Sequence, residues 1–240
     1  MEFRKSTLEQ REYFYRNRFD ISKLRKFLNV KPQFFVVDPG TETRIIKNKK
    51  DIDKLLILKQ GISYRKLGEK LIEHLPEDVY YDRNIYKNPE KCLGDFNFKE
   101  SFSSGNFIGQ ELAFDIDPEN IINSKSLWSF NKELIIQASG IALNFYNELR
   151  GYFRNIRIVY SGRGFHIHVF DKKAYSLSMA ERDELNKRFL KYKIDPWVSY
   201  GKIRLIRLPY SLNALCSRVC TPVSLGELKN FDPDDEKYLI

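Results

Sequence analysis

Two aspartates one residue apart have the spacing in this chain that most clearly indicates chemistry. They lie in L-A-F-D-I-D-P at residues 112–118. In a strand this alternation places Asp115 and Asp117 on one face and the apolar side chains on the other. Two like charges side by side repel, which favours a divalent cation with hard oxygen ligands, Mg²⁺ or Mn²⁺, an ion that usually serves phosphates. A solvated strand edge is the alternative, since such a short motif is common by chance.

A glycine turn forms the second candidate site, in S-G-R-G-F-H-I-H at residues 161–168. Its two glycines let backbone N–H groups face an anion without obstruction by a Cβ atom. Between them, Arg163 is a fork-shaped phosphate donor. His166 and His168 are expected on one face of the strand that follows. A polar hairpin with two surface histidines is the alternative.

A third carboxylate and a further arginine lie near the C-terminal end. Asp195 falls between a predicted helix and a predicted strand, where it can join the first two aspartates. Arg207 lies on an otherwise apolar strand, so it needs an anion nearby, from the protein or from a ligand. The alternative for Asp195 is an ordinary loop acid.

The elements that position these residues follow from periodicity and turn signals. The N-terminal part predicts a helix over 7–29, a strand over 33–37 with a partner at 44–47, a helix over 51–75 and a loop from 80 to 105. The later part predicts strands at 111–117, 156–160, 165–170 and 203–208, with helices at 134–149 and 179–193. The β-α-β-β-α-β order of residues 109–208 indicates an α+β fold with an RRM-like core.

Composition narrows the class of protein. The 240 residues suffice for one sizeable domain or two small ones, and 42% hydrophobic residues with 30% charged residues exclude a disordered chain. Lys and Arg exceed Asp and Glu by 41 − 32 = 9, so polyanions are natural partners. The aromatic share of 14% offers stacking surfaces for bases. No apolar run approaches a membrane span, and the N-terminus has no pattern of a signal peptide.

Cysteine usage predicts a reducing, cytoplasmic setting. Cys92, Cys216 and Cys220 are too few and too scattered for a disulfide framework. His74 with these cysteines could complete a structural zinc site. That site is disfavoured, because structural zinc sites normally show two paired ligand clusters.

Together the three blocks resemble the catalytic (small) subunit of archaeal and eukaryotic DNA primase, in the archaeo-eukaryotic primase superfamily. That family shows an hhDhD strand, an S-G-R-G-x-H turn, and a later Asp before a basic strand that ends in Pro. The corresponding residues here are 113–117, 161–166 and 195 with 204–212, and the F-D-P at 231–233 is similar to the end of the archaeal subunit. The resemblance implies a primase-type fold with an RRM-like mixed-sheet core flanked by helices. It implies one catalytic domain over 1–240, with an N-terminal α/β part in 1–108 and the catalytic core in 109–233.

Carried over residue by residue, the resemblance assigns roles to eight residues. It makes Asp115, Asp117 and Asp195 the catalytic, metal-binding carboxylates of a two-metal site for Mg²⁺ or Mn²⁺. It assigns nucleotide binding to Ser161, Arg163, Gly164, His166 and Arg207. The implied activity is template-directed nucleotidyl transfer from nucleoside triphosphates, making short primers on single-stranded DNA. The implied partner is a large primase subunit, in an archaeal-type intracellular setting.

Departures from the family pattern keep other functions open. Asn213 stands where the family often has His, Cys216 follows in place of Lys-Thr-Gly, and the family's zinc-binding insertion has no counterpart. The P-Y-S at 209–211 and T-P-V at 221–223 resemble the polymerase domain of bacterial end-joining ligases. The alternatives are a primase-polymerase or end-joining repair polymerase of the same superfamily, and a non-catalytic RRM-like nucleic-acid-binding module. A phosphodiesterase using His166 and His168 fits less well, because it usually needs a second histidine motif.

Overall fold

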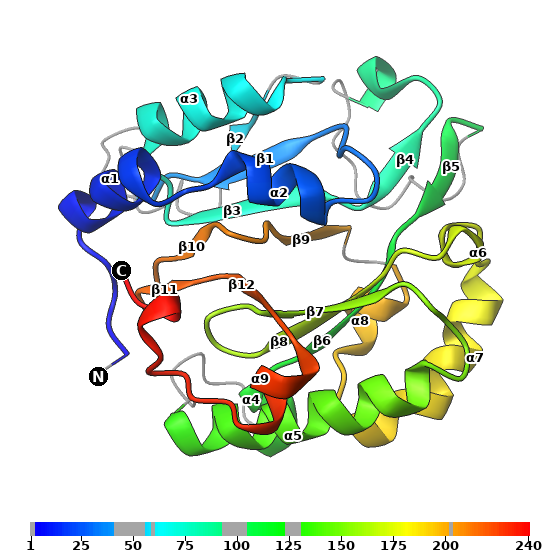
Figure 1. The fold of residues 1–240 in the computed structure, drawn as a ribbon. Coiled ribbons are helices and arrows are strands. Elements are labelled where there is room, and N and C mark those ends of the chain that lie inside the picture. Colours follow the sequence, from blue (N-terminus) through cyan, green and yellow to red (C-terminus); the bar gives the residue numbers. More distant parts are fainter. Residues whose placement is uncertain (1–2, 41–55, 59–60, 93–104, 123–130, 202–203) are drawn as a thin grey trace.

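The computed structural model describes residues 3–40, 56–58, 61–92, 105–122, 131–201 and 204–240. Two antiparallel sheets are stacked between two groups of helices (Figure 1). Helices α1, α2 and α3 cover the outer side of the larger sheet, and α5 runs beneath the smaller one (Figure 1). The chain therefore has an α+β architecture, as the sequence predicts.

The larger sheet contains six strands of the described chain in the order β11-β10-β3-β1-β2, with β9 also paired to β3. Their bounds are Phe35–Asp38 (β1), Leu56–Ile57 (β2), Asp78–Asp82 (β3), Leu205–Arg207 (β9), Leu212–Asn213 (β10) and Arg218–Val219 (β11). The sheet takes strands from both sides of residue 108, so strand pairing crosses the boundary expected between the N-terminal part and the core.

The smaller sheet has the order β12-β7-β8-β6. Its strands are Leu112–Ile116 (β6), Ile156–Tyr160 (β7), Phe165–Val169 (β8) and Thr221–Val223 (β12). Strands β6 and β8 are antiparallel, and their register places Asp115 opposite His166. A separate two-stranded ribbon pairs β4 (Asn84–Tyr86) with β5 (Phe107–Gln110).

The helices begin at clear capping residues. Thr7 and Gln10 form a reciprocal capping box at α1, and Asn131 caps α5 through the Leu134 amide. The α-helices are Leu8–Asn17 (α1), Ile21–Phe27 (α2), Tyr64–His74 (α3), Pro118–Ile122 (α4), Lys132–Leu149 (α5), Lys172–Tyr175 (α6), Met179–Phe189 (α7), Pro196–Ser199 (α8) and Leu225–Lys229 (α9). Short 3₁₀ turns cover Pro89–Cys92, Leu190–Tyr192 and Glu236–Tyr238. Among the described residues, no helix has the length and apolar character needed to cross a bilayer.

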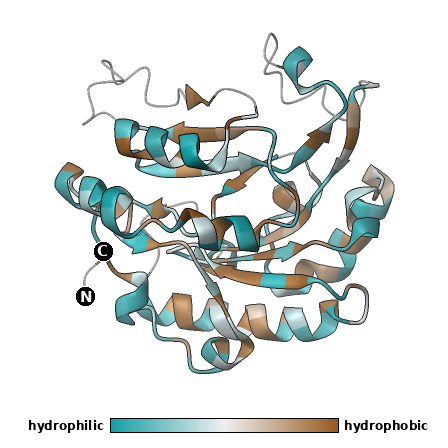
Figure 2. Cartoon of the chain, turned by 45° about the horizontal axis from the view of Figure 1, so that its top comes forward, coloured by the Kyte–Doolittle hydropathy of each residue, from teal (hydrophilic) through white to brown (hydrophobic). Residues whose placement is uncertain are grey.

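The two faces of β6 belong to different cores. Leu112, Phe114 and Ile116 pack in the core beneath the smaller sheet, together with apolar side chains of α5. Hydrophobic and hydrophilic segments alternate along α5, as expected for a helix with one buried face (Figure 2). Ala113, on the other face, packs in the core that includes side chains of the larger sheet. The predicted alternation of β6 is confirmed, and its acidic face turns toward the other sheet.

Several element predictions need correction. The helix expected over 7–29 is two helices, because Asp20 caps a new start through the amides of Ser22 and Lys23. Strand β2 and helix α3 lie within the helix expected over 51–75, while residues 51–55 and the expected strand at 44–47 fall outside the described residues.

The loop expected over 80–105 was wrong where the structure describes it. Most of β3, all of β4 and a 3₁₀ turn occupy residues 80–92. The polar residues Asp82, Arg83 and Asn84 gave a loop-like composition, yet all three are buried. Asp82 forms an ion pair with Arg204 at 3.0 Å, which sequence periodicity does not reveal.

The last predicted strand lies in the other sheet. Strand β9 pairs with β3 of the larger sheet, and β12 is the fourth strand beside β7. The order of elements along the chain was correct from β6 to β8, but sequence order does not determine the sheet a later strand joins.

Candidate active site

Seven of the eight predicted site residues line one cavity. Its volume is about 190 Å³, and the predicted residues around it are Asp115, Asp117, Ser161, Arg163, His166, Asp195 and Arg207. The other lining residues are Tyr80, Val198, Leu205, Ile206 and Asn213. These residues come from β6, β8 and the turn before it, α8 and the larger sheet, so the cavity lies where the two sheets meet.

Strand pairing and one backbone contact bring the acids together. His166 Nε2 lies 3.6 Å from Asp115 Oδ1 on the neighbouring strand. The Asp195 amide donates to the Asp115 carbonyl at 2.8 Å, which attaches the beginning of α8 to β6. Asp195 Oδ1 accepts from the Trp197 amide at 2.8 Å and caps α8. Asp195 is therefore placed beside Asp115 by main-chain geometry.

Asp115 is the carboxylate of the site whose charged form is most disfavoured by its surroundings. Its Oδ1 atom is buried and has no hydrogen-bond partner among the described residues. Burial raises the pKa of the Asp115 carboxyl well above its usual value, and the charges of Asp117 and Asp195 raise it further. An unpaired buried carboxylate oxygen is the kind of donor that a hard cation such as Mg²⁺ or Mn²⁺ prefers.

Arg163 supplies positive charge to this acidic group. Its Nη2 lies 3.1 Å from Asp117 Oδ2, and its Nη1 lies 2.9 Å from Glu119 Oε1. Within the part of the chain that the structure describes, no three His, Cys, Asp or Glu side chains are gathered as a ready metal site. A cation that uses Asp117 therefore has to compete with the guanidinium of Arg163.

The glycine turn packs directly against the acids. The Ser161 amide donates to the Gly164 carbonyl at 2.9 Å, and the Gly164 amide donates to Ser161 Oγ at 3.0 Å. A Cβ atom on Gly164 would lie 2.4 Å from Asp117 Oδ1 and from the Ile116 carbonyl. The role the structure shows for Gly164 is this close approach to β6.

The two histidines of β8 are buried, so the alternative of a polar hairpin with two surface histidines is wrong. Burial lowers the pKa of His166 well below its usual value, and nearby His168 and the site arginines lower it further. His166 is therefore neutral at pH 7 and offers a hydrogen bond rather than a charge. His168 Nδ1 lies 2.8 Å from Glu111 Oε1 and 3.2 Å from the Tyr81 hydroxyl.

Arg207 has an anion of the protein as its partner. Its guanidinium pairs with the Asp78 carboxylate and lies 5.4 Å from the centre of the Tyr80 ring. Burial is the largest influence and lowers the pKa of Arg207, but the charge of Asp78, the hydrogen bond to it and the nearby Tyr80 together outweigh burial, so the net shift is upward. The sequence argument required an anion from protein or ligand, and the structure supplies a carboxylate while leaving Arg207 at the cavity.

Two polar lining residues, Tyr80 and Asn213, and two acids that pair with the site arginines, Glu119 and Asp78, were not predicted as site residues. Glu119 could have been found, because it continues the spacing of two begun by Asp115 and Asp117. Tyr80 begins the stretch that was predicted as a loop, and Asp78 lies two residues before it on the same strand. Asn213 was noticed only as a departure from a family pattern, and no local signal shows that it reaches the cavity.

The comparisons with known proteins show where this chain belongs. No protein-family model matches it. It is 42% identical to an uncharacterized DNA primase small subunit-like protein of Archaeoglobus fulgidus, over 96% of this chain and 88% of the relative. The chain belongs to the DNA primase small subunit-like family.

More distant relatives of the family carry the name DNA primase small subunit PriS. The relative from Pyrobaculum calidifontis is 25% identical over 68% of this chain, and the one from Thermococcus kodakarensis is 26% identical over 86% of it. The matches cover 65% and 59% of those relatives, so this chain spans less than two thirds of their length. Among solved structures, the polymerase domain of Mycobacterium tuberculosis Ligase D in complex with DNA aligns with a TM-score of 0.49. It has 16% identity and covers 76% of this chain and 63% of that one.

Proposed function

We propose that this chain is a nucleotidyltransferase that makes short primers on single-stranded DNA by template-directed, divalent-metal-dependent synthesis. The observation that carries the proposal is that three motifs far apart in the sequence line one cavity, to which they bring three carboxylates and two arginines. This combination of groups suits a phosphoryl transfer, in which acids hold cations and basic groups bind phosphate oxygens.

The chemistry follows from which side chains line the cavity. Asp115, Asp117 and Asp195 would hold Mg²⁺ or Mn²⁺, whose contribution is to stabilise charge on the attacking and leaving oxygens. Arg163 would turn from Asp117 toward the triphosphate, and Arg207 would stabilise phosphate charge from the opposite sheet. Ser161 and neutral His166 would add hydrogen bonds that orient the phosphates.

The partners in this proposal are nucleoside triphosphates, a single-stranded DNA template and a growing primer. The net charge of +9 favours association with these polyanions. A large primase subunit is the protein partner we expect, because the relatives are named small subunits. We further propose that residues 1–240 act as one catalytic domain.

The test is incorporation of labelled nucleotides on single-stranded DNA with Mg²⁺ or Mn²⁺, with and without a primer. The wild type is compared with Asp115→Ala/Asp117→Ala. The matched control is Glu69→Ala/Glu73→Ala, which removes the same charge from two exposed positions on α3. We expect product from the wild type and the control, and none from the aspartate variant.

The pattern of product separates the alternatives. Product without a primer identifies a primase, whereas product only with a primer identifies a repair-type polymerase of the same superfamily. No product with either metal, together with DNA binding that survives Asp115→Ala/Asp117→Ala, would leave a nucleic-acid-binding module and contradict the proposal.

A further inference from the structure

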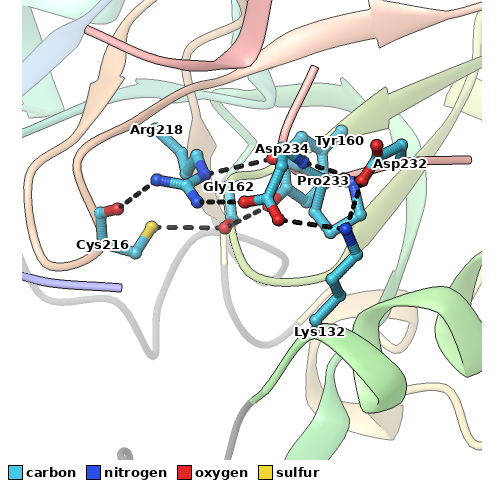
Figure 3. A network of polar contacts seen from close by, with 8 residues as sticks. All are labelled: Lys132, Tyr160, Gly162, Cys216, Arg218, Asp232, Pro233 and Asp234. Atoms are coloured by element: carbon cyan, nitrogen blue, oxygen red, sulfur yellow. Dashed lines mark hydrogen bonds and ion pairs between the residues drawn. The ribbon is translucent and has the colours of Figure 1, made fainter. Parts of the chain in front are cut away.

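The turn at residues 161–164 is held from behind by side chains of the β10–β11 hairpin. Asn213 Nδ2 donates to the Ser161 carbonyl at 3.0 Å. The Cys216 thiol donates to the Gly162 carbonyl at 3.2 Å, and the Tyr160 hydroxyl donates to the same oxygen at 2.7 Å (Figure 3). Two consecutive carbonyl groups of the turn are therefore fixed by side chains.

Fixing these carbonyls also fixes the amides of the turn. In a trans peptide the C=O and N–H groups point in opposite directions. The contacts to Ser161 and Gly162 carbonyls consequently set the directions of the Gly162 and Arg163 N–H groups. Gly162 has a φ of +95°, in the left-handed region. Successive N–H groups around such a residue form a concave anion site, so its shape depends on the hairpin.

The contact between turn and hairpin is close and buried. A Cβ atom on Gly162 would lie 2.9 Å from Asn213 Cβ and 3.1 Å from Cys216 Sγ. Burial raises the pKa of the Cys216 thiol to about 12, so the thiol keeps its proton and remains a donor at neutral pH. Asn213 is itself 3% exposed and lines the cavity.

The hairpin is in turn anchored to the C-terminal segment. Arg218 donates to the Pro233 carbonyl at 3.2 Å and to the Cys216 carbonyl at 3.3 Å, and it pairs with Asp234 at 3.1 Å. Lys132, at the start of α5, lies 3.0 Å from the same Asp234 carboxylate (Figure 3). The support of the turn is thus continuous with α5 and the C-terminal segment.

We propose that Asn213 and Cys216 are positioning residues that hold the 161–164 turn in the shape that binds a nucleotide triphosphate. This inference rests on the proposed function, because the triphosphate is the ligand that function assigns to the turn. Both residues stand where the sequence departs from the related primase pattern, so this chain supports the turn with a carboxamide and a buried thiol.

The test uses Cys216→Ala, which removes the donor, and Cys216→Ser, which keeps one. Cys220→Ala is the matched control, because Cys220 is also a buried thiol but belongs to the core of the larger sheet. Binding of the fluorescent N-methylanthraniloyl derivative of ATP is titrated with Mg²⁺, and inorganic tripolyphosphate serves as competitor. We expect Cys216→Ala to bind both ligands about five-fold more weakly than the wild type. The affinities of Cys216→Ser and Cys220→Ala should stay within about two-fold of the wild type. Asn213→Ala is expected to lower the affinity for both ligands about ten-fold, because the Ser161 carbonyl loses its hydrogen-bond donor.

Hydrogen exchange of the peptide that contains residues 161–164 gives a readout that needs no ligand. We expect faster exchange in Cys216→Ala than in Cys216→Ser or Cys220→Ala. Equal exchange and equal binding in Cys216→Ala and Cys220→Ala would overturn the inference, since the thiol would then serve packing alone. If the wild type neither binds nor incorporates nucleotides, the proposed function fails. Exchange then decides alone whether Cys216 supports the turn.

Discussion

Two groups of buried polar side chains, one around Glu111 and one around Asp115, lie between the acidic face of β6 and the histidine face of β8. They differ in how their carboxylates are hydrogen-bonded. Around Glu111, both carboxylate oxygens accept from the Tyr81 hydroxyl, and His168 Nδ1 lies 2.8 Å from Oε1. Around Asp115, the nearest charged neighbours include two further carboxylates, and Oδ1 has no hydrogen-bond partner among the described residues.

The difference indicates which group serves stability and which serves chemistry. A buried polar group that is hydrogen-bonded contributes to one well-defined fold. A group whose charges repel and whose oxygen is unpaired costs stability, and such groups concentrate at functional sites. We therefore expect the Glu111 group to serve stability and the Asp115 group to serve the proposed chemistry.

The largest expected effect would come from Asp115→Asn. Nucleotide incorporation should fall by at least about 1000-fold, because a cation loses a carboxylate ligand. The free energy of unfolding should stay equal or rise, because a repelling buried charge is removed. Steady-state incorporation and urea unfolding measure the two effects, with Asp183→Asn on α7, which does not line the cavity, as control. Loss of activity together with loss of stability would contradict the contrast between the two groups.

Tyr81→Phe should have the opposite profile. It removes the hydroxyl that donates to Glu111 and leaves a buried carboxylate without that donor, so we expect the free energy of unfolding to fall by about 1–3 kcal/mol. Nucleotide incorporation per folded molecule should stay within about three-fold of the wild type. Tyr13→Phe, at an exposed ring on α1, is the control. A large loss of incorporation with unchanged stability would place Tyr81 in the catalytic machinery instead.

The pH dependence of stability should separate wild type from Asp115→Asn. The raised pKa of Asp115 means that the folded chain keeps a proton that the unfolded chain has released. The stability that this group contributes is therefore fully present below its ordinary pKa of 3.8 and is lost as pH rises through the raised folded pKa. Between pH 5 and pH 8, the free energy of unfolding of the wild type, measured with urea, should fall by about 1 kcal/mol or more relative to that of Asp115→Asn. A constant difference across that range would contradict the raised pKa.

Glu119→Gln should give the smallest effect. Arg163 is shared between Asp117 and Glu119, so loss of one carboxylate leaves the guanidinium freer to bind a triphosphate. We expect the fluorescent ATP derivative to bind about three-fold more tightly, a change typical of one partly exposed ion pair. Glu133→Gln, in the first turn of α5, is the control. Weaker binding of Mn²⁺ in Glu119→Gln would instead make Glu119 a metal ligand.

Much of the candidate site was readable from local patterns. The alternation around Asp115 and Asp117 predicted the two faces of β6, because side chains of a strand alternate regardless of what covers them. The glycines flanking Arg163 predicted a tight turn, and the structure adds that Gly164 approaches Asp117 too closely for any side chain. The roles assigned to these residues stay predictions until the experiments above are done.

Local patterns failed where long-range contacts decide the outcome. Asp82 and Arg83 looked like loop residues, because their burial depends on partners such as Arg204, more than a hundred positions away. The sheet that β9 joins was mispredicted for the same reason, since the pairing of β9 with β3 is set by packing between distant segments.

The sequence by itself determined the local requirements of this protein: which residues alternate, where glycine is needed, and which charges lack a partner nearby in the chain. Only the tertiary structure decided how those requirements are met. It brought Asp195 to Asp115 through a backbone hydrogen bond, gave Arg207 the carboxylate of Asp78, and placed Asn213 and Cys216 behind the turn. The physical reason is that alternation and backbone conformation are properties of neighbouring residues, whereas burial and ion pairing depend on which distant surfaces pack together.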